Sequence, residues 1–119
     1  MINNIGIGLD IENIGRFTKL DLKKNRNFFD RIYTQKEKEY SLSKPNHPSH
    51  FAARFAAKEA VKKTIRDNVA FNEIEITNDK NGAPKVKFLN KRMEKKYKSI
   101  ISISHTKSIV QAVCITFKK

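Results

Sequence analysis

The chain has 119 residues, 39% of them hydrophobic, which suits one domain over residues 1–119 with a small core. No stretch reaches the roughly 18 apolar residues of a membrane span, and the first residues lack the pattern of an export signal, so we expect a cytoplasmic protein without membrane partners. The net charge of +13 predicts attraction to polyanions but leaves nucleic acid, acidic proteins and phosphorylated small molecules all open. The single Cys114 excludes an intrachain disulfide and is expected to be buried.

Residues 4–12 alternate in the manner of a half-buried β-strand. Apolar residues occupy positions 5, 7, 9 and 11, whereas glycines and acids occupy positions 6, 8, 10 and 12. The glycines leave room for a backbone or a ligand to approach closely beside Asp10. Alternatively, they only admit a packed helix, and Asp10 caps a turn.

Three helices are predicted in the next part of the chain. Residues 28–33 form a short one, and Thr34 with Glu37 three residues later is a capping box for a second over 35–42. Residues 43–49, with two prolines, should interrupt the chain before the longest helix, over 49–66, for which Ser49 is the candidate N-cap.

The most informative part of that long helix is FAARFAAKEAVKK, residues 51–63. Its alanines fall mostly on one side and allow close packing against a sheet. At the edge of this side, Glu59 lies one turn before Lys63 and among further cations. Lys63 therefore either serves a site beside Glu59 or only forms an i to i+4 pair with it.

The pattern of the C-terminal half predicts mainly strands. Residues 73–77 and 84–89 predict a hairpin, a basic helix follows at 90–98, and further strands follow at 100–104 and 109–117. Together the elements predict an α+β fold, with a mainly antiparallel sheet packed against one long helix plus short helices.

Two acids point to chemistry when they are considered together. Asp10 and Glu59 each lie where small residues permit close approach, and two carboxylates can hold Mg²⁺, which completes its coordination with water and substrate phosphates. Cations of the same helix would neutralise further phosphate charge: Arg54, Lys58, Lys62 and Lys63. The combination suggests a phosphoryl-type transfer.

Five blocks of the sequence carry a resemblance to a known family: GIGLDIENIGRF, FFDRIYTQKE, FAARFAAKEAVKK, EIEITNDKNGAPKV and SISHTKSIVQAV. In this order, and over nearly the whole chain, they resemble holo-acyl-carrier-protein synthases, the small bacterial type of 4′-phosphopantetheinyl transferase. The G-x-D motif ending at Asp10 and the K-E-A motif around Glu59 are short, but their combination with SISHT is specific. The resemblance implies transfer of 4′-phosphopantetheine from coenzyme A to a serine of apo-acyl carrier protein, with release of adenosine 3′,5′-bisphosphate.

The resemblance also implies roles for individual residues. Asp10 and Glu59 match the metal-binding acids, so Mg²⁺ is the expected cofactor, and Lys63 matches a lysine beside the pyrophosphate. The serine proton is expected to pass to Glu59 or to a metal-held water, and the sequence does not choose between them. The remaining coenzyme A contacts implied by the resemblance are Arg54, Lys58, Pro84, His105 and Thr106, of which His105 is expected to bind a phosphate.

The implied partners are coenzyme A, the carrier protein and further copies of the chain. Acyl carrier proteins are acidic, so Arg16 and Arg31 are the expected docking residues, and complementary charge would accelerate the encounter. Family members of this length form homotrimers with active sites between subunits, which is therefore the expected assembly. One departure is the segment 64–71, TIRDNVAF, which has no glycine where the family has a glycine-rich segment, so contacts of that loop are not carried over.

Two other classes of function compete with this interpretation. A basic nucleic-acid-binding module is disfavoured because the aromatic residues lie in apolar runs and no RNP, helix-turn-helix or zinc pattern is present. An inactive phosphopantetheine-binding or trimeric scaffold is disfavoured because both Asp10 and Glu59 are present.

Overall fold

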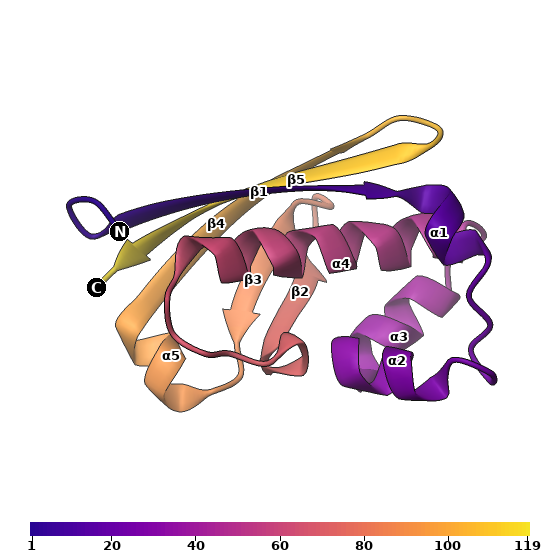
Figure 1. Cartoon of the computed structure of the whole chain (residues 1–119), viewed down its shortest axis with the longest axis horizontal. Coiled ribbons are helices and arrows are strands. Elements are labelled where there is room, and N and C mark those ends of the chain that lie inside the picture. Colours follow the sequence, from indigo (N-terminus) through magenta and orange to yellow (C-terminus); the bar gives the residue numbers. More distant parts are fainter.

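A computed structural model describes all residues, 1–119. The longest helix, α4 (His47–Thr64), lies between two antiparallel sheets (Figure 1). The larger sheet has the order β1-β5-β4 and the smaller is the hairpin β2-β3. The strands are β1 (Ile5–Asn13), β2 (Ile74–Asn78), β3 (Pro84–Phe88), β4 (Tyr97–His105) and β5 (Ile109–Lys118). The predicted α+β fold is confirmed.

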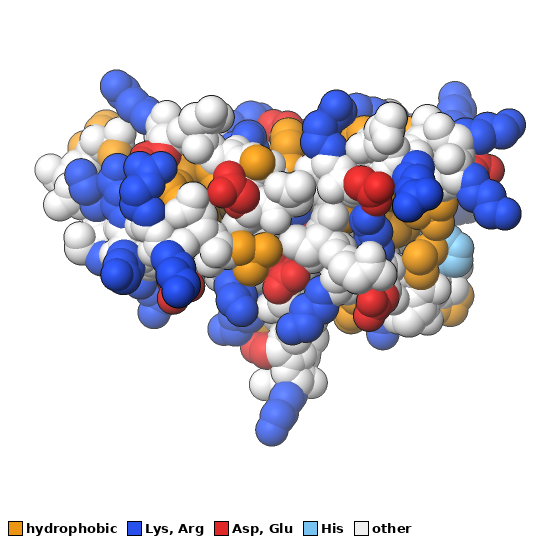
Figure 2. Space-filling view, turned by 90° about the horizontal axis from the view of Figure 1, so that it is seen from below, with side chains coloured by type: hydrophobic (Ala, Val, Ile, Leu, Met, Phe, Trp, Pro, Cys, Tyr) orange, Lys and Arg blue, Asp and Glu red, His pale blue; other side chains and the backbone are white.

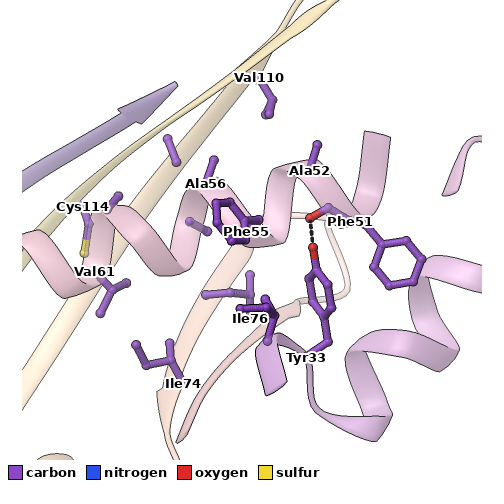
Figure 3. Packing of buried hydrophobic residues seen from close by; sticks show 14 of the residues in the cluster. Tyr33, Phe51, Ala52, Phe55, Ala56, Val61, Ile74, Ile76, Val110 and Cys114 are labelled. Carbon is purple, nitrogen blue, oxygen red and sulfur yellow. Dashed lines mark hydrogen bonds between the residues drawn. The ribbon is translucent and has the colours of Figure 1, made fainter. Parts of the chain in front are cut away.

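Buried residues of both sheets pack against α4. Val110 and Cys114 of β5 approach the helix from the larger sheet, whereas Ile74 and Ile76 of β2 approach it from the hairpin (Figure 3). The alanines of the helix make this double contact possible, and four of them are fully buried: Ala52, Ala56, Ala57 and Ala60. Cys114 is buried as expected.

The glycine face of β1 is the buried one. A Cβ placed on Gly6 would lie 2.1 Å from the carbonyl oxygen of Thr64, and one on Gly8 would lie 2.1 Å from that of Ala60. The backbone of β1 therefore rests directly on α4, with no space for a side chain between them. The glycines thus admit a packed helix, as the alternative predicted, whereas Asp10 lies within β1 and does not cap a turn.

The apolar face of β1 points the other way, and nothing in the chain covers it. Ile7 is 70% exposed, and its neighbour across the sheet is Ile115 of β5, which in turn pairs with Ile100 of β4. The alternation predicted for residues 4–12 is thus correct. The strand is half-buried with its apolar face outward.

The predicted interruption over 43–49 is present but shorter, because α4 begins at His47 and Pro48 lies in its first turn. Asn46 is the N-cap, and Pro48 lies in the first turn, where a proline loses no helical hydrogen bond. The helix ends at Thr64 because Ile65 is extended. The predicted start at Ser49 and end at residue 66 are each displaced by two residues.

The short helices pack around the first half of α4. They are α1 (Ile14–Thr18), which the sequence did not predict, α2 (Arg26–Ile32) and α3 (Gln35–Leu42). The capping box of α3 is present, since Thr34 accepts from the backbone N–H of Glu37 while Glu37 accepts from that of Thr34. Both bounds of α3 agree with the prediction.

The C-terminal elements follow the predicted order. The single-turn η1 (Phe71–Glu73) precedes β2, and α5 (Lys91–Lys96) is shorter than predicted because Tyr97 already begins β4. The glycine-free loop after α4 is tied to this region, where Asp67 accepts from Tyr97 at 2.5 Å and from Lys96 at 2.9 Å. None of the helices combines the length and apolar character that crossing a bilayer requires.

We expect Gly8→Ala to lower the free energy of unfolding by about 1–3 kcal/mol, because the new methyl group forces β1 away from α4. The matched control is Gly15→Ala, where the nearest atom is 4.0 Å away, and this helical position should be neutral or gain up to ~1 kcal/mol. Urea unfolding measures both. Equal stability of the two variants would contradict the close contact.

Candidate active site

Asp10 and Lys63 meet where β1 crosses the C-terminal half of α4. The Lys63 Nζ lies 3.2 Å from Asp10 Oδ1 and donates to the carbonyl of Leu9 at 2.8 Å. No ion pair joins Lys63 to Glu59. Of the two alternatives for this lysine, the structure thus favours a position beside the strand acid over a pair along its own helix.

One oxygen of Asp10 has no partner. The side chain is only 12% exposed, and its Oδ2 is buried without a hydrogen bond, although its Oδ1 faces Lys63. A carboxylate oxygen withdrawn from water without a donor is unfavourable. The site is therefore ready for a cation or a hydrogen-bond donor at this atom.

Glu12 adds a third carboxylate that the sequence analysis had left without a role. Burial, followed by the nearby carboxylate of Asp10, raises the pKa of Glu12 to about 7, and the charge of Glu59 contributes further. The three acids therefore share one neighbourhood. The available signal was their position, because Glu12 follows Asp10 on the same face of β1.

Arg16 lies at the rim of these acids. Its Nη1 is 3.1 Å from Glu12 Oε1, and its guanidinium lies over the rings of Phe17 and Phe55. The side chain is still 57% exposed, so it is both held in place and accessible. Arg31 is exposed on α2.

His105 and Thr106 border a cavity of about 490 Å³ at the other end of α4. Ser49 and His50 of the helix line its opposite wall. Burial lowers the pKa of His50, and the nearby charges of Arg54, Lys44 and His105 lower it further. The side chain of Lys107 and the hydroxyl groups of Ser49 and Thr106 in the lining suit an anionic ligand.

Arg54 is buried and lines a separate cavity of about 240 Å³ with Tyr40 and Asn78, and it is not fully paired. Its Nη2 donates to Asn78 Oδ1 at 2.8 Å, and its guanidinium stacks 4.2 Å from the centre of the Tyr40 ring. The Nε is buried without a partner. Burial is the main cause that lowers the pKa of Arg54.

The fold does not place Lys58 beside Asp10, Glu12 and Glu59. It is fully buried, and its Nζ donates to Glu37 Oε1 at 2.5 Å and to the carbonyls of Ile32 and Phe71. All three N–H donors are used, so none is available to a phosphate. Lys62, whose Nζ donates to the carbonyl of Val69, is likewise engaged within the chain.

Pro84 also lies apart from the other predicted contacts. It begins β3 and lines a groove of about 560 Å³ between β3 and β4, which shares no lining residue with the His105 cavity. Within one chain, the structure therefore groups Asp10, Glu12, Glu59 and Lys63 in one place and His105 and Thr106 in another.

The acids fit a hard divalent cation. Asp10 offers a buried oxygen without a partner, and carboxylate oxygens are the donors that Mg²⁺ prefers. No group of three or more His, Cys, Asp or Glu side chains is placed so that it could hold a metal ion. Mg²⁺ commonly takes only one or two protein carboxylates and completes its octahedron with water and phosphate oxygens.

Comparison with known proteins identifies the family. Residues 6–115 match the ACPS model, described as the 4′-phosphopantetheinyl transferase superfamily, and the chain belongs to this superfamily. It is 41% identical to a holo-[acyl-carrier-protein] synthase from Caldicellulosiruptor saccharolyticus, over 100% of the chain and 99% of that protein.

Solved structures agree with the sequence comparison. The holo-[acyl-carrier-protein] synthase of Neisseria meningitidis has a TM-score of 0.79 and 32% identity, covering 95% of this chain and 98% of that one. The synthase of Bacillus anthracis, solved in complex with CoA (3′,5′-ADP), has a TM-score of 0.78 and 29% identity, covering 96% of each chain.

Lys58→Met should lower the free energy of unfolding by about 3–5 kcal/mol, because Glu37 would remain as a buried charge without its partner. The same change at the exposed Lys36 of α3 should alter it by less than about 0.5 kcal/mol. Thermal and urea unfolding measure the two variants. A Lys58→Met protein with unchanged stability but lost coenzyme A binding would instead support the contact implied by the resemblance.

Proposed function

We propose that the protein transfers 4′-phosphopantetheine from coenzyme A to a serine of apo-acyl carrier protein and releases adenosine 3′,5′-bisphosphate. The observation that carries the proposal is the buried, unpartnered oxygen of Asp10 beside Lys63, with Glu59 in the same neighbourhood. The relatives named holo-[acyl-carrier-protein] synthase support the choice of substrates.

Asp10, Glu59 and Lys63 would receive the pyrophosphate of coenzyme A. Asp10 and Glu59 would hold Mg²⁺, which when bound supplies positive charge to the phosphate oxygens. Lys63, whose charged end already lies at Asp10, would offset the negative charge that grows on the leaving phosphate. These residues fix the reacting groups in place, which is the main requirement of phosphoryl transfer.

The reaction replaces one phosphorus–oxygen bond by another. The serine oxygen forms a bond to the phosphorus that carries pantetheine, while the bond from this phosphorus to the bridging oxygen breaks. The electron pair leaves with adenosine 3′,5′-bisphosphate, and the serine proton passes to Glu59 or to a water beside it.

The nucleotide end of coenzyme A would occupy the cavity bordered by His105 and Thr106. Lys107 in its lining and the nearby charges of Arg54 and Lys44 favour a phosphate there. A phosphate in this cavity would raise the pKa of His50, which burial and then the charges of Arg54, Lys44 and His105 lower.

The carrier protein would dock on the basic surface near α1 and α2. Lys and Arg side chains are spread over the face of the molecule that lies away from the larger sheet, with Asp and Glu side chains interspersed among them (Figure 2). Arg16 lies beside the acids with its guanidinium over two aromatic rings, so it loses little freedom when it pairs with a carrier carboxylate. Arg31 would add a second contact from α2.

The transfer can be followed by mass spectrometry of an apo-acyl carrier protein incubated with coenzyme A and Mg²⁺. We expect Asp10→Ala and Glu59→Ala each to slow transfer by about 100-fold or more, because each removes a ligand that holds charge at the reacting phosphate. A chelator should stop transfer, and added Mg²⁺ should restore it. Glu94→Ala, an exposed acid on α5, is the matched control and should react normally.

Two results would count against the proposal. Full activity of Asp10→Ala or Glu59→Ala would contradict the assignment of these two acids as metal ligands. Salt-sensitive binding of DNA or RNA without modification of the carrier would instead favour the nucleic-acid-binding module.

We further propose a homotrimer joined through the exposed face of the larger sheet. This face carries Ile5, Ile7, Leu9, Ile11, Ile100, Ile109, Val113, Ile115 and Phe117. An apolar face of this extent in a soluble protein is typical of an interface. The exposed apolar face indicates an interface but does not fix how many copies associate. The number three is taken from the family resemblance.

Ile115→Asp, at the centre of this face, should convert the assembly from about three times the chain mass of 13.8 kDa to a single chain, because it buries a charge in the interface. Leu42→Asp makes the same change at an exposed apolar residue of α3, away from the sheet, and should leave the assembly intact. Analytical ultracentrifugation measures both. A wild-type protein that sediments as a monomer would refute the assembly.

A further inference from the structure

An ion pair between Glu12 and Arg16 joins the acids of the candidate active site to the proposed docking surface. Glu12 Oε1 lies 3.1 Å from Arg16 Nη1, across the junction of β1 and α1. The Glu12 side chain is only 12% exposed, and the charges of Asp10 and Glu59 act on it. Glu12 is therefore linked both to the acids assigned to the metal and to the cation assigned to the carrier protein.

The guanidinium of Arg16 uses little of its binding capacity in this pair. A guanidinium has five N–H donors, and the only hydrogen bond of this one goes to Glu12. The centres of the Phe17 and Phe55 rings lie 5.7 and 5.3 Å from its Cζ atom, and they hold the cation in place independently of its carboxylate partner. Arg16 can therefore exchange one carboxylate for another without leaving its position.

A carboxylate of the carrier protein would compete with Glu12 for this guanidinium. Glu12 meets Arg16 through a single nitrogen, whereas a carboxylate that arrives from solvent can bind the guanidinium with both oxygens, which is the stronger arrangement. Once Arg16 pairs with the carrier, its charge no longer neutralises Glu12. The negative potential at Asp10 and Glu59 then rises, because an unpaired carboxylate remains beside them.

We propose that Glu12 is a positioning residue that couples carrier docking to metal binding. In the free protein Glu12 holds Arg16, docking transfers Arg16 to the carrier, and the charge released on Glu12 strengthens Mg²⁺ binding at Asp10 and Glu59. This inference rests on the proposed function. Glu12 acts through its charge and not as a third ligand, since no three acids are placed so that they could hold an ion together.

Coupling between two ligands is reciprocal, so Mg²⁺ must tighten carrier binding by the same factor by which the carrier tightens Mg²⁺ binding. The physical reason is the same in both directions. A cation at Asp10 and Glu59 offsets the charge of Glu12, which weakens its hold on Arg16 and leaves the guanidinium available to the carrier. The complex that carries both ligands is thereby favoured over either partly loaded form.

A simpler effect has to be separated from this coupling. A bound divalent cation attracts an acidic carrier by its charge alone, whatever residue occupies position 12. At an ionic strength of roughly 0.15 M this attraction is screened over about 8 Å. Glu12→Gln leaves the direct attraction in place and removes only the exchange of partners, because the uncharged amide does not hold Arg16 as an ion pair.

The first test measures Mg²⁺ affinity by calorimetry without the carrier, at pH 8.5, where Glu12 is ionised. We expect Arg16→Gln to raise the Mg²⁺ affinity about fivefold, because it leaves Glu12 unpaired as docking would. In a Glu12→Gln background the same change should have less than a twofold effect. Lys19→Gln removes an exposed cation at the end of α1 and is the matched control, with less than a twofold effect expected.

The second test measures the affinity of a carrier protein whose acceptor serine is replaced by alanine, so that it binds without reacting. Each protein is titrated with a chelator present, or with Mg²⁺ at about ten times its own dissociation constant, at constant ionic strength. We expect Mg²⁺ to tighten carrier binding about fivefold in the wild type and in Lys19→Gln, and less than twofold in Glu12→Gln.

Two results would overturn the inference. One is a wild type whose carrier affinity changes less than twofold with Mg²⁺, which decides the question even if Glu12→Gln does not fold. The other is an effect of Arg16→Gln on Mg²⁺ affinity that persists in the Glu12→Gln background, because Arg16 would then act on the metal directly. Failure of the proposed function is distinguishable, since the wild type would then not modify an unaltered carrier protein at all.

Discussion

The direct contact between the backbones of β1 and α4 is the constraint on which the rest of the structure depends. At Gly6 and Gly8 no side chain separates the strand from the helix, and the nearest atoms are carbonyl oxygens of α4. Because the two elements lie so close, Lys63 on the helix reaches Asp10 and Leu9 on the strand. The group of charged residues that we assign to phosphate chemistry is therefore a consequence of two missing side chains.

A second constraint fixes the opposite side of the helix. Lys58 is buried against Glu37, and Glu37 also accepts from the backbone N–H groups of Thr34 and Ile76. One ion pair thus joins α4, the start of α3 and β2. Adjacent residues of the helix, Lys58 and Glu59, consequently face different surroundings: Lys58 holds the core together, and Glu59 remains available at the site.

The sequence predicted the parts that depend on local rules. The capping box at Thr34 located α3 to the residue, and the alternation in β1 located Asp10 beside the glycines. It did less well where two local rules compete. Pro48 is compatible with either a break or a first helical turn, and only the packing of α4 selects the second.

The sequence by itself determined which residues share a face and which chemical groups are available, because periodicity and residue type are local properties. The tertiary structure decided which face is covered, and it left the isoleucines of β1 outward while the glycine face met α4. It also decided the surroundings of each charge. Desolvation and pairing depend on residues distant in sequence, which is why Lys58 entered the core and Glu12 joined Asp10 and Glu59.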